Sequence, residues 1–166
     1  MNFDTFWQLI DDTRHAADGD PRRQSQLLRA ALADTTTETI TRFDEIFHDL
    51  RDRAFRAELW EAAYVIKGGC SDDGFLEFRE WLISRGKAVY DQALANPESL
   101  ADVIDVGEIP DLYPILLGVA GDAYEQLTGQ EMPVHYRTAP KLHGELHAEE
   151  LIPARFPILA AKFLEA

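Results

Sequence analysis

Several features are scarce in this chain of 166 residues. Its one cysteine excludes an internal disulfide and a metal cluster built from several cysteines, and it suits a reducing compartment. No run of about 18 apolar residues occurs, so no segment has the length and composition of a membrane-spanning helix. The opening MNFDTFWQLIDDTR carries acids where a secretory signal peptide has basic residues. These features predict a soluble, cytoplasmic protein that binds no membrane.

Basic residues are also in deficit. Thirty Asp and Glu stand against sixteen Lys and Arg, which gives a formal net charge of −14. The resulting field repels phosphate backbones, so nucleic acid is excluded as a direct partner. An acidic surface commonly serves solubility, and the alternative is a basic protein partner that is steered in by complementary charge.

The alternation that indicates strands is missing, and helical spacing runs along nearly the whole chain. The clearest amphipathic helix has apolar residues every three or four positions: Ile40, Phe43, Phe47, Leu50 and Ala54. Its polar positions are expected to face water: Glu45, His48, Asp49 and Arg51. Asp20 followed by Pro21 predicts another helix start, because Asp is a favoured N-cap and Pro suits the first helical position.

Further helices are predicted toward the C-terminus. One is strongly buried through Phe75, Phe78, Trp81, Leu82 and Ile83. Arg79 and Glu80 are expected on the solvated side of that helix. Another is expected from about 111 to 128, with five residues inward: Leu112, Ile115, Leu116, Val119 and Leu127. A last short helix is expected to dock through Phe156, Ile158, Leu159 and Phe163, with Pro157 in its first turn.

Together these patterns predict the fold class. It is an all-α, single-domain orthogonal bundle of about six to eight helices that covers residues 1–166. Prolines at 133 and 140 make a long regular element improbable there, so an irregular segment is expected before the short C-terminal helix.

The stretch VIKGGCSDDGF, residues 65–75, joins two of the predicted helices. Gly68 or Gly69 ends the first helix in a left-handed cap, and Ser71 or Asp72 caps the second. The two aspartates complement the positive end of the second helix, and Cys70 is a small thiol under the turn. The predicted structural junction comprises Gly68, Gly69, Cys70, Ser71 and Gly74.

Three functional hypotheses compete with this structural interpretation of the junction. Cys70 could act as a nucleophile or redox sensor, although neighbouring carboxylates oppose thiolate formation. Asp72, Asp73 and Glu77 could bind a hard cation, although the run lacks the alternating oxygen ligands of a calcium loop. The same three acids could bind an arginine or lysine of a partner.

His143 and His147 are a second candidate site, because residues four apart share one face of a helix. Zinc would need a third ligand such as Glu149 or His135. Gly144 weakens the helix that would align the two rings, and the glutamate between them stands one position later than in the metalloprotease pattern. Exposed histidines on a turn are the alternative. No motif in the chain implies a cofactor.

The sequence also resembles a known family. The resemblance rests on three segments: LWEAAYVIKGGCSDDGFLEFREWLISRGKAVYDQALANPESLA, the opening FWQLID and the later AYEQLTGQEMP. They are similar to the bacterial domain-of-unknown-function family 4240, from Phe6 to about Pro133. The resemblance implies a bacterial, mostly helical, cytoplasmic protein and supplies no catalytic residue.

The expected function is a non-catalytic module, immunity-like or regulatory, that binds a basic protein through Asp72, Asp73 and Glu77. The alternative is a metal- or small-ligand-binding protein, or an enzyme, that uses the junction from Cys70 to Asp73.

Overall fold

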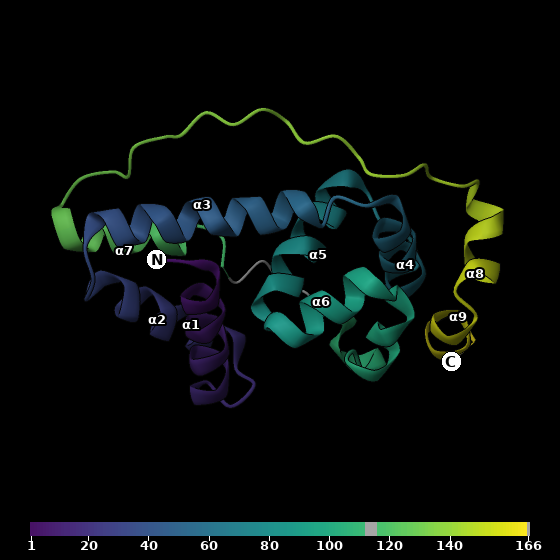
Figure 1. The fold of residues 1–166 in the computed structure, drawn as a ribbon. Coiled ribbons are helices and arrows are strands. Elements are labelled where there is room, and N and C mark those ends of the chain that lie inside the picture. Colours follow the sequence, from purple (N-terminus) through teal and green to yellow (C-terminus); the bar gives the residue numbers. More distant parts are fainter. Residues whose placement is uncertain (112–115, 166) are drawn as a thin grey trace.

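The computed structural model describes residues 1–111 and 116–165, and its fold is all-α, as predicted (Figure 1). The α-helices are α1 (Phe3–Ala16), α2 (Pro21–Ala33), α3 (Thr37–Arg53), α4 (Ala57–Lys67), α5 (Asp72–Ser84), α6 (Lys87–Ala95), α7 (Val119–Thr128), α8 (Ile152–Arg155) and α9 (Pro157–Phe163). The 3-10 helices are η1 (Pro97–Asp102), η2 (Val106–Asp111) and η3 (Glu149–Leu151). None of the described helices combines the length and the apolar character needed to cross a membrane.

Capping residues set several helix boundaries. The Asp20 side chain accepts hydrogen bonds from the first turn of α2, whose first residue is Pro21. The Thr36 hydroxyl caps α3 in the same way. Gly68 ends α4 in the left-handed conformation, with φ 66°, which a residue with a Cβ adopts only at a cost. The sequence predicted the boundaries at Asp20 and Gly68 because each depends on a local contact.

The predicted helix over 111–128 is shorter in the structure. It begins at Val119, because Gly118 takes a left-handed conformation, with φ 79°, just before it. Leu116 and Val119 are buried as predicted, but Leu127 is 42% exposed and lies on the solvent side. Two of its expected core residues fall outside the described residues: Leu112 and Ile115.

The helices share one apolar core. In Figure 1, α3 runs along one side of the molecule, with α1, α2 and α7 at one end and α4, α5 and α6 at the other. The buried apolar residues from α1 to α9 form one cluster. Its largest fully buried side chains include Tyr90, Phe6, Phe43, Phe75 and Phe78. The long α3 therefore connects the two ends of the fold.

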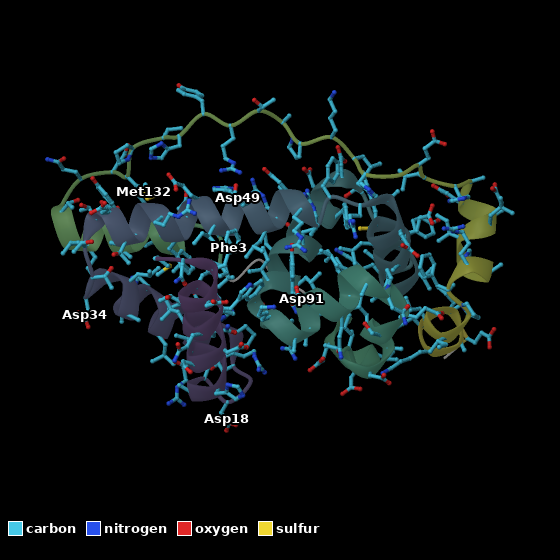
Figure 2. The ribbon with its side chains drawn as sticks, viewed as in Figure 1. Phe3, Asp18, Asp34, Asp49, Asp91 and Met132 are labelled. Carbon is cyan, nitrogen blue, oxygen red and sulfur yellow. The ribbon has the colours of Figure 1, made fainter. Side chains whose placement is uncertain are left out.

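Between Gln130 and Ala148 the described chain contains no helix, as predicted. Its first part, residues 130–142, arches along α3 in Figure 1, and we call it the strap. Arg137 of the strap donates hydrogen bonds to the carboxylates of Asp49, at 2.5 Å, and Asp52, at 3.3 Å. Figure 2 labels Asp49 on α3 and Met132 at the beginning of the strap. One guanidinium thus joins the strap to the long helix.

The chain then docks again at the far end of the molecule. Residues 143–163, which we call the clasp, pack α8 and α9 against α4 and η1. Pro157 is the first residue of α9, as predicted, and Leu159 is fully buried. Ile158 was expected to face inward, but it is 57% exposed because the short helix presents only one face to the core.

Candidate functional site

The junction between α4 and α5 is held by hydrogen bonds. The Ser71 hydroxyl accepts from the N–H of Gly74 at 3.1 Å, so Ser71 is the N-cap of α5. The indole N–H of Trp60 donates to the carbonyl of Cys70 at 2.9 Å. The backbone from Gly68 to Gly74 is therefore fixed at both of its ends.

The three acids of the junction point to solvent. Asp72 and Asp73 occupy the first turn of α5, and Glu77 lies one turn further along. All three are exposed. Within residues 1–111 and 116–165, no ion pair engages any of them. We call Asp72, Asp73 and Glu77 the acidic rim.

Cys70 is half-buried beside this rim. Burial raises the pKa of its thiol; the nearby Lys67 lowers it and Glu77 raises it further. The net shift is upward, so the thiol stays protonated near neutral pH. This environment does not activate Cys70 as a nucleophile, which requires a lowered pKa.

The two candidate histidines do not share a helical face, which corrects the geometry proposed from their spacing. The His143 backbone pairs instead with the segment just before α4: its N–H donates to the Phe55 carbonyl, and its carbonyl accepts from the N–H of Ala57, the first residue of α4. The next residue, Gly144, has φ 87°, so no helix continues from 143 to 147. In the part of the chain that the structure describes, no three His, Cys, Asp or Glu residues are grouped to hold a metal ion.

The structure reveals a buried charged cluster between α3 and α5. Arg79 and Glu80 were predicted on the solvated side of α5, and this is wrong: their exposed fractions are 6% and 1%. Arg51, also expected in water, donates to the Glu80 carboxylate at 2.9 Å. The sequence held a signal for Arg79 alone, since it stands four residues from both Phe75 and Ile83 and so falls on the apolar face of α5.

Stacking and hydrogen bonds compensate for the burial of the Arg79 guanidinium. Its guanidinium carbon lies 4.6 Å from the ring centre of Phe55 and 5.0 Å from that of Phe75. Its Nη1 donates to the Arg51 carbonyl at 3.0 Å. Burial, together with the neighbouring Arg51 charge, lowers the pKa of Arg79 to about 10. Arg79 remains a cation at neutral pH and ties α3 to α5.

A second buried charged residue lies in α4, and the sequence analysis did not predict its burial. Glu61 of α4 is 1% exposed, and its partners come from the clasp. The backbone N–H of His147 donates to Oε1 at 2.7 Å, and the Nδ1 of the same residue lies 2.8 Å from that oxygen. The Nε of Arg155 donates to Oε2 at 2.9 Å. These partners are about 90 residues away in sequence, so no local pattern marked Glu61.

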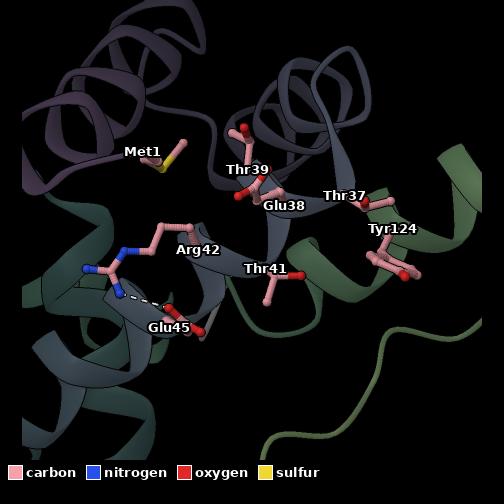
Figure 3. A pocket seen from close by; sticks show the side chains of 8 residues that line it. All are labelled: Met1, Thr37, Glu38, Thr39, Thr41, Arg42, Glu45 and Tyr124. Carbon is pink, nitrogen blue, oxygen red and sulfur yellow. Dashed lines mark hydrogen bonds and ion pairs between the residues drawn. The ribbon is translucent and has the colours of Figure 1, made fainter.

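A shallow cleft lies at the N-terminal end of α3 (Figure 3). Its volume is about 690 Å³. Its lining residues are Met1, Thr37, Glu38, Thr39, Thr41, Arg42, Glu45 and Tyr124. Figure 3 shows Arg42 paired with Glu45, at 2.8 Å, so the positive charge in the cleft is already neutralised. Its hydroxyls and carboxylates supply hydrogen bonds without a thiol or an imidazole.

The chain matches the model of a known family. The model described as "Protein of unknown function (DUF4240)" matches residues 1–126. No match exists among the curated proteins or the solved structures that were compared. The family match contains the junction, the buried charges of α3 to α5 and Glu61, and it ends before the strap and the clasp.

Proposed function

Since the chain belongs to the DUF4240 family over residues 1–126, whose function is unknown, we propose a function from its own geometry: a non-catalytic, cytoplasmic bacterial module that binds a basic protein. The role is immunity-like or regulatory. The acidic rim is the proposed contact surface. The net charge of −14 supports this class of partner, because opposite charge speeds encounter and fixes orientation.

The observation that carries the proposal is the solvent exposure of the acidic rim. Its three carboxylates are exposed, and no described cation pairs with them. They stand on a junction whose backbone is fixed by the Ser71 cap and by the Trp60 hydrogen bond. A rigid carboxylate group loses little entropy when it binds a guanidinium or an ammonium.

The test is a quantitative pull-down from the lysate of the source organism with the wild-type protein and an Asp72→Asn, Asp73→Asn variant. An Asp12→Asn, Asp18→Asn variant is the control, because it also removes two exposed acids, from α1 and the turn after it. Asp18 lies at the far end of α1 in Figure 2. We expect one basic protein to be captured by the wild type and the control, lost in the rim variant and released by salt.

Two results would reject the proposal. Equal capture by all three proteins removes the acidic rim as the contact surface. Capture of no basic protein by the wild type removes the proposed class of partner.

A further inference from the structure

The clasp occupies a surface that belongs to the family domain. That surface is formed by α4 and η1, which lie within residues 1–126, whereas the clasp begins at residue 143. Both α8 and α9 pack on α4, and α9 also packs on η1. We call the surface of α4 and η1 under the clasp the α4–η1 groove. The groove therefore belongs to the family domain, and the clasp that fills it lies outside the family match.

The polar contacts across the groove run mainly in one direction. The family domain supplies acceptors: the Glu61 carboxylate, the Glu98 carboxylate and the Ala101 carbonyl. The clasp supplies donors to them: Arg155 Nε at 2.9 Å, the Ile158 N–H at 2.7 Å and Lys162 Nζ at 2.7 Å. Two contacts run the other way: the Tyr64 hydroxyl donates to Glu149, and the Ala57 N–H donates to the His143 carbonyl. The groove thus recognises a donor-rich, positively charged occupant.

Apolar contacts complete the docking. Ile152, Phe156 and Leu159 of the clasp have exposed fractions of 4%, 3% and 0%. Phe156 directly follows Arg155, so the cation and the aromatic anchor are adjacent. The groove therefore fits a short helical segment with an arginine before an aromatic residue and a leucine three positions later.

Glu61 supplies the charge complementarity between the groove and its occupant. It is 1% exposed, and the hydrogen bonds to its carboxylate come from the clasp residues His147 and Arg155. A buried carboxylate without a donor costs several kcal/mol. The family domain therefore carries an acid whose buried state depends on a segment from outside the family match.

The strap adds little to this docking. Between residues 131 and 142, the described hydrogen bonds to the body of the protein are the two of Arg137, and Met132 packs half-buried against the core. Val134 and Tyr136 of the strap are 78% and 99% exposed. The clasp is thus held mainly by its own contacts.

From these contacts we propose that the α4–η1 groove is a docking site for an arginine-bearing apolar helical segment of a partner protein, and that the clasp is its resident competitor. A partner segment binds when the clasp leaves, and it takes the Glu61 hydrogen bond that Arg155 now makes. This site lies apart from the acidic rim and does not depend on it.

The test uses a fluorescein-labelled peptide of residues 143–163, added to the full chain and followed by fluorescence anisotropy. Arg155→Ala in the protein loosens the clasp and leaves Glu61 in place. We expect the peptide to bind this variant at least about 10-fold more tightly than the wild type, because the groove is open for a larger fraction of time. Glu61→Gln added to Arg155→Ala should remove that gain.

Two further variants provide a second test of the clasp and a control. Leu159→Ala loosens the clasp through its apolar side and should give a similar gain, which covers the case in which Arg155→Ala does not fold. Arg29→Ala removes one exposed cation from α2 and should bind the peptide as the wild type does. Circular dichroism checks that each variant is folded.

The inference fails if neither clasp variant gains affinity, or if the gain persists after Glu61→Gln. Neither result depends on a lysate or on the acidic rim, so failure here is distinct from failure of the proposed function.

Discussion

Arg79, Glu80 and Glu61 are charged side chains inside an all-α core, and each is stabilised differently. Arg79 lies against two aromatic rings and donates to a backbone carbonyl. Glu80 accepts from Arg51, while burial raises the pKa of its carboxyl despite that partner. Burial also raises the pKa of Glu61, but the hydrogen bonds from His147 and Arg155 outweigh it and lower the pKa. Single substitutions at Arg79 and Glu61 measure how much each kind of contact contributes to the free energy of unfolding.

Replacing Arg79 tests how much of its role is packing. Arg79→Ala removes the stacking on Phe55 and Phe75, leaves a cavity and deprives the Arg51 carbonyl of its donor. We expect it to lower the free energy of unfolding by about 2 to 4 kcal/mol. Arg79→Met keeps an unbranched stem in the same space, so its cost should be less than half as large. Urea denaturation measures both, and equal costs would contradict the packing argument.

Glu61 gives the protein a specific acid sensitivity. Its pKa in the folded state is lower than the ordinary 4.5, so its contribution to stability is present above that value and is lost as pH falls through the folded-state pKa. We expect Glu61→Gln to lower the free energy of unfolding at pH 7 by about 1 to 3 kcal/mol. The difference from the wild type should shrink as the pH falls below the ordinary value of 4.5 and through the lowered folded-state pKa.

Urea denaturation over that pH range measures the effect. Glu58→Gln, an exposed position on the same helix, is the control and should keep the wild-type pH dependence. Parallel curves for the wild type and Glu61→Gln would show that the Glu61 contacts contribute nothing to acid stability.

At the scale of the helices, the sequence predicted what depends on local contacts. Capping at Asp20 and Gly68 involves neighbours within three or four positions, so those boundaries followed from residue type. The burial of Arg79 and Glu80 depends on α3, whose residue Arg51 is 28 or 29 positions away. Spacing placed Arg79 near the apolar face of α5, but it could not show that α3 covers Glu80.

The candidate sites also differ in whether their contacts are local or distant in the sequence. The Ser71 cap could be predicted because its partner Gly74 is three residues on. The histidine pair failed because spacing of four matters only inside a helix, and His143 pairs with the backbone beside α4. Glu61 gave no sequence signal, because its partners lie in the clasp.

The cap of α5 allows a test of the junction as a structural element. Ser71→Ala removes the acceptor for the Gly74 N–H, and we expect a loss of about 1 kcal/mol in the free energy of unfolding. Ser71→Asp should retain most of the stability, because a carboxylate accepts the same bond and favours the positive helix end. Thermal unfolding followed by circular dichroism distinguishes them, and an alanine variant as stable as the wild type would show that the cap contributes nothing.

At the scale of the whole molecule, the chain consists of a family domain with a segment folded back onto it. The strap runs along α3, from the end of the molecule that holds α7 to the end that holds α4 (Figure 1). It connects the two ends through exposed residues and the Arg137 contacts. Cutting it should therefore disturb neither the core nor the docking of the clasp.

Limited digestion with trypsin tests this organisation. Lys141 is exposed in the strap, so we expect early cleavage there, which mass spectrometry identifies by the fragment 142–166. At neutral pH that fragment should co-elute with the rest of the chain in size-exclusion chromatography, because the clasp retains its contacts to Glu61, Glu98 and Ala101. As the pH falls below 4.5 and through the lowered pKa of Glu61, the fragment should dissociate because Glu61 becomes protonated. The cleaved Arg155→Ala variant should lose it at neutral pH, and loss from the wild type at neutral pH would mean that the strap holds the clasp in place.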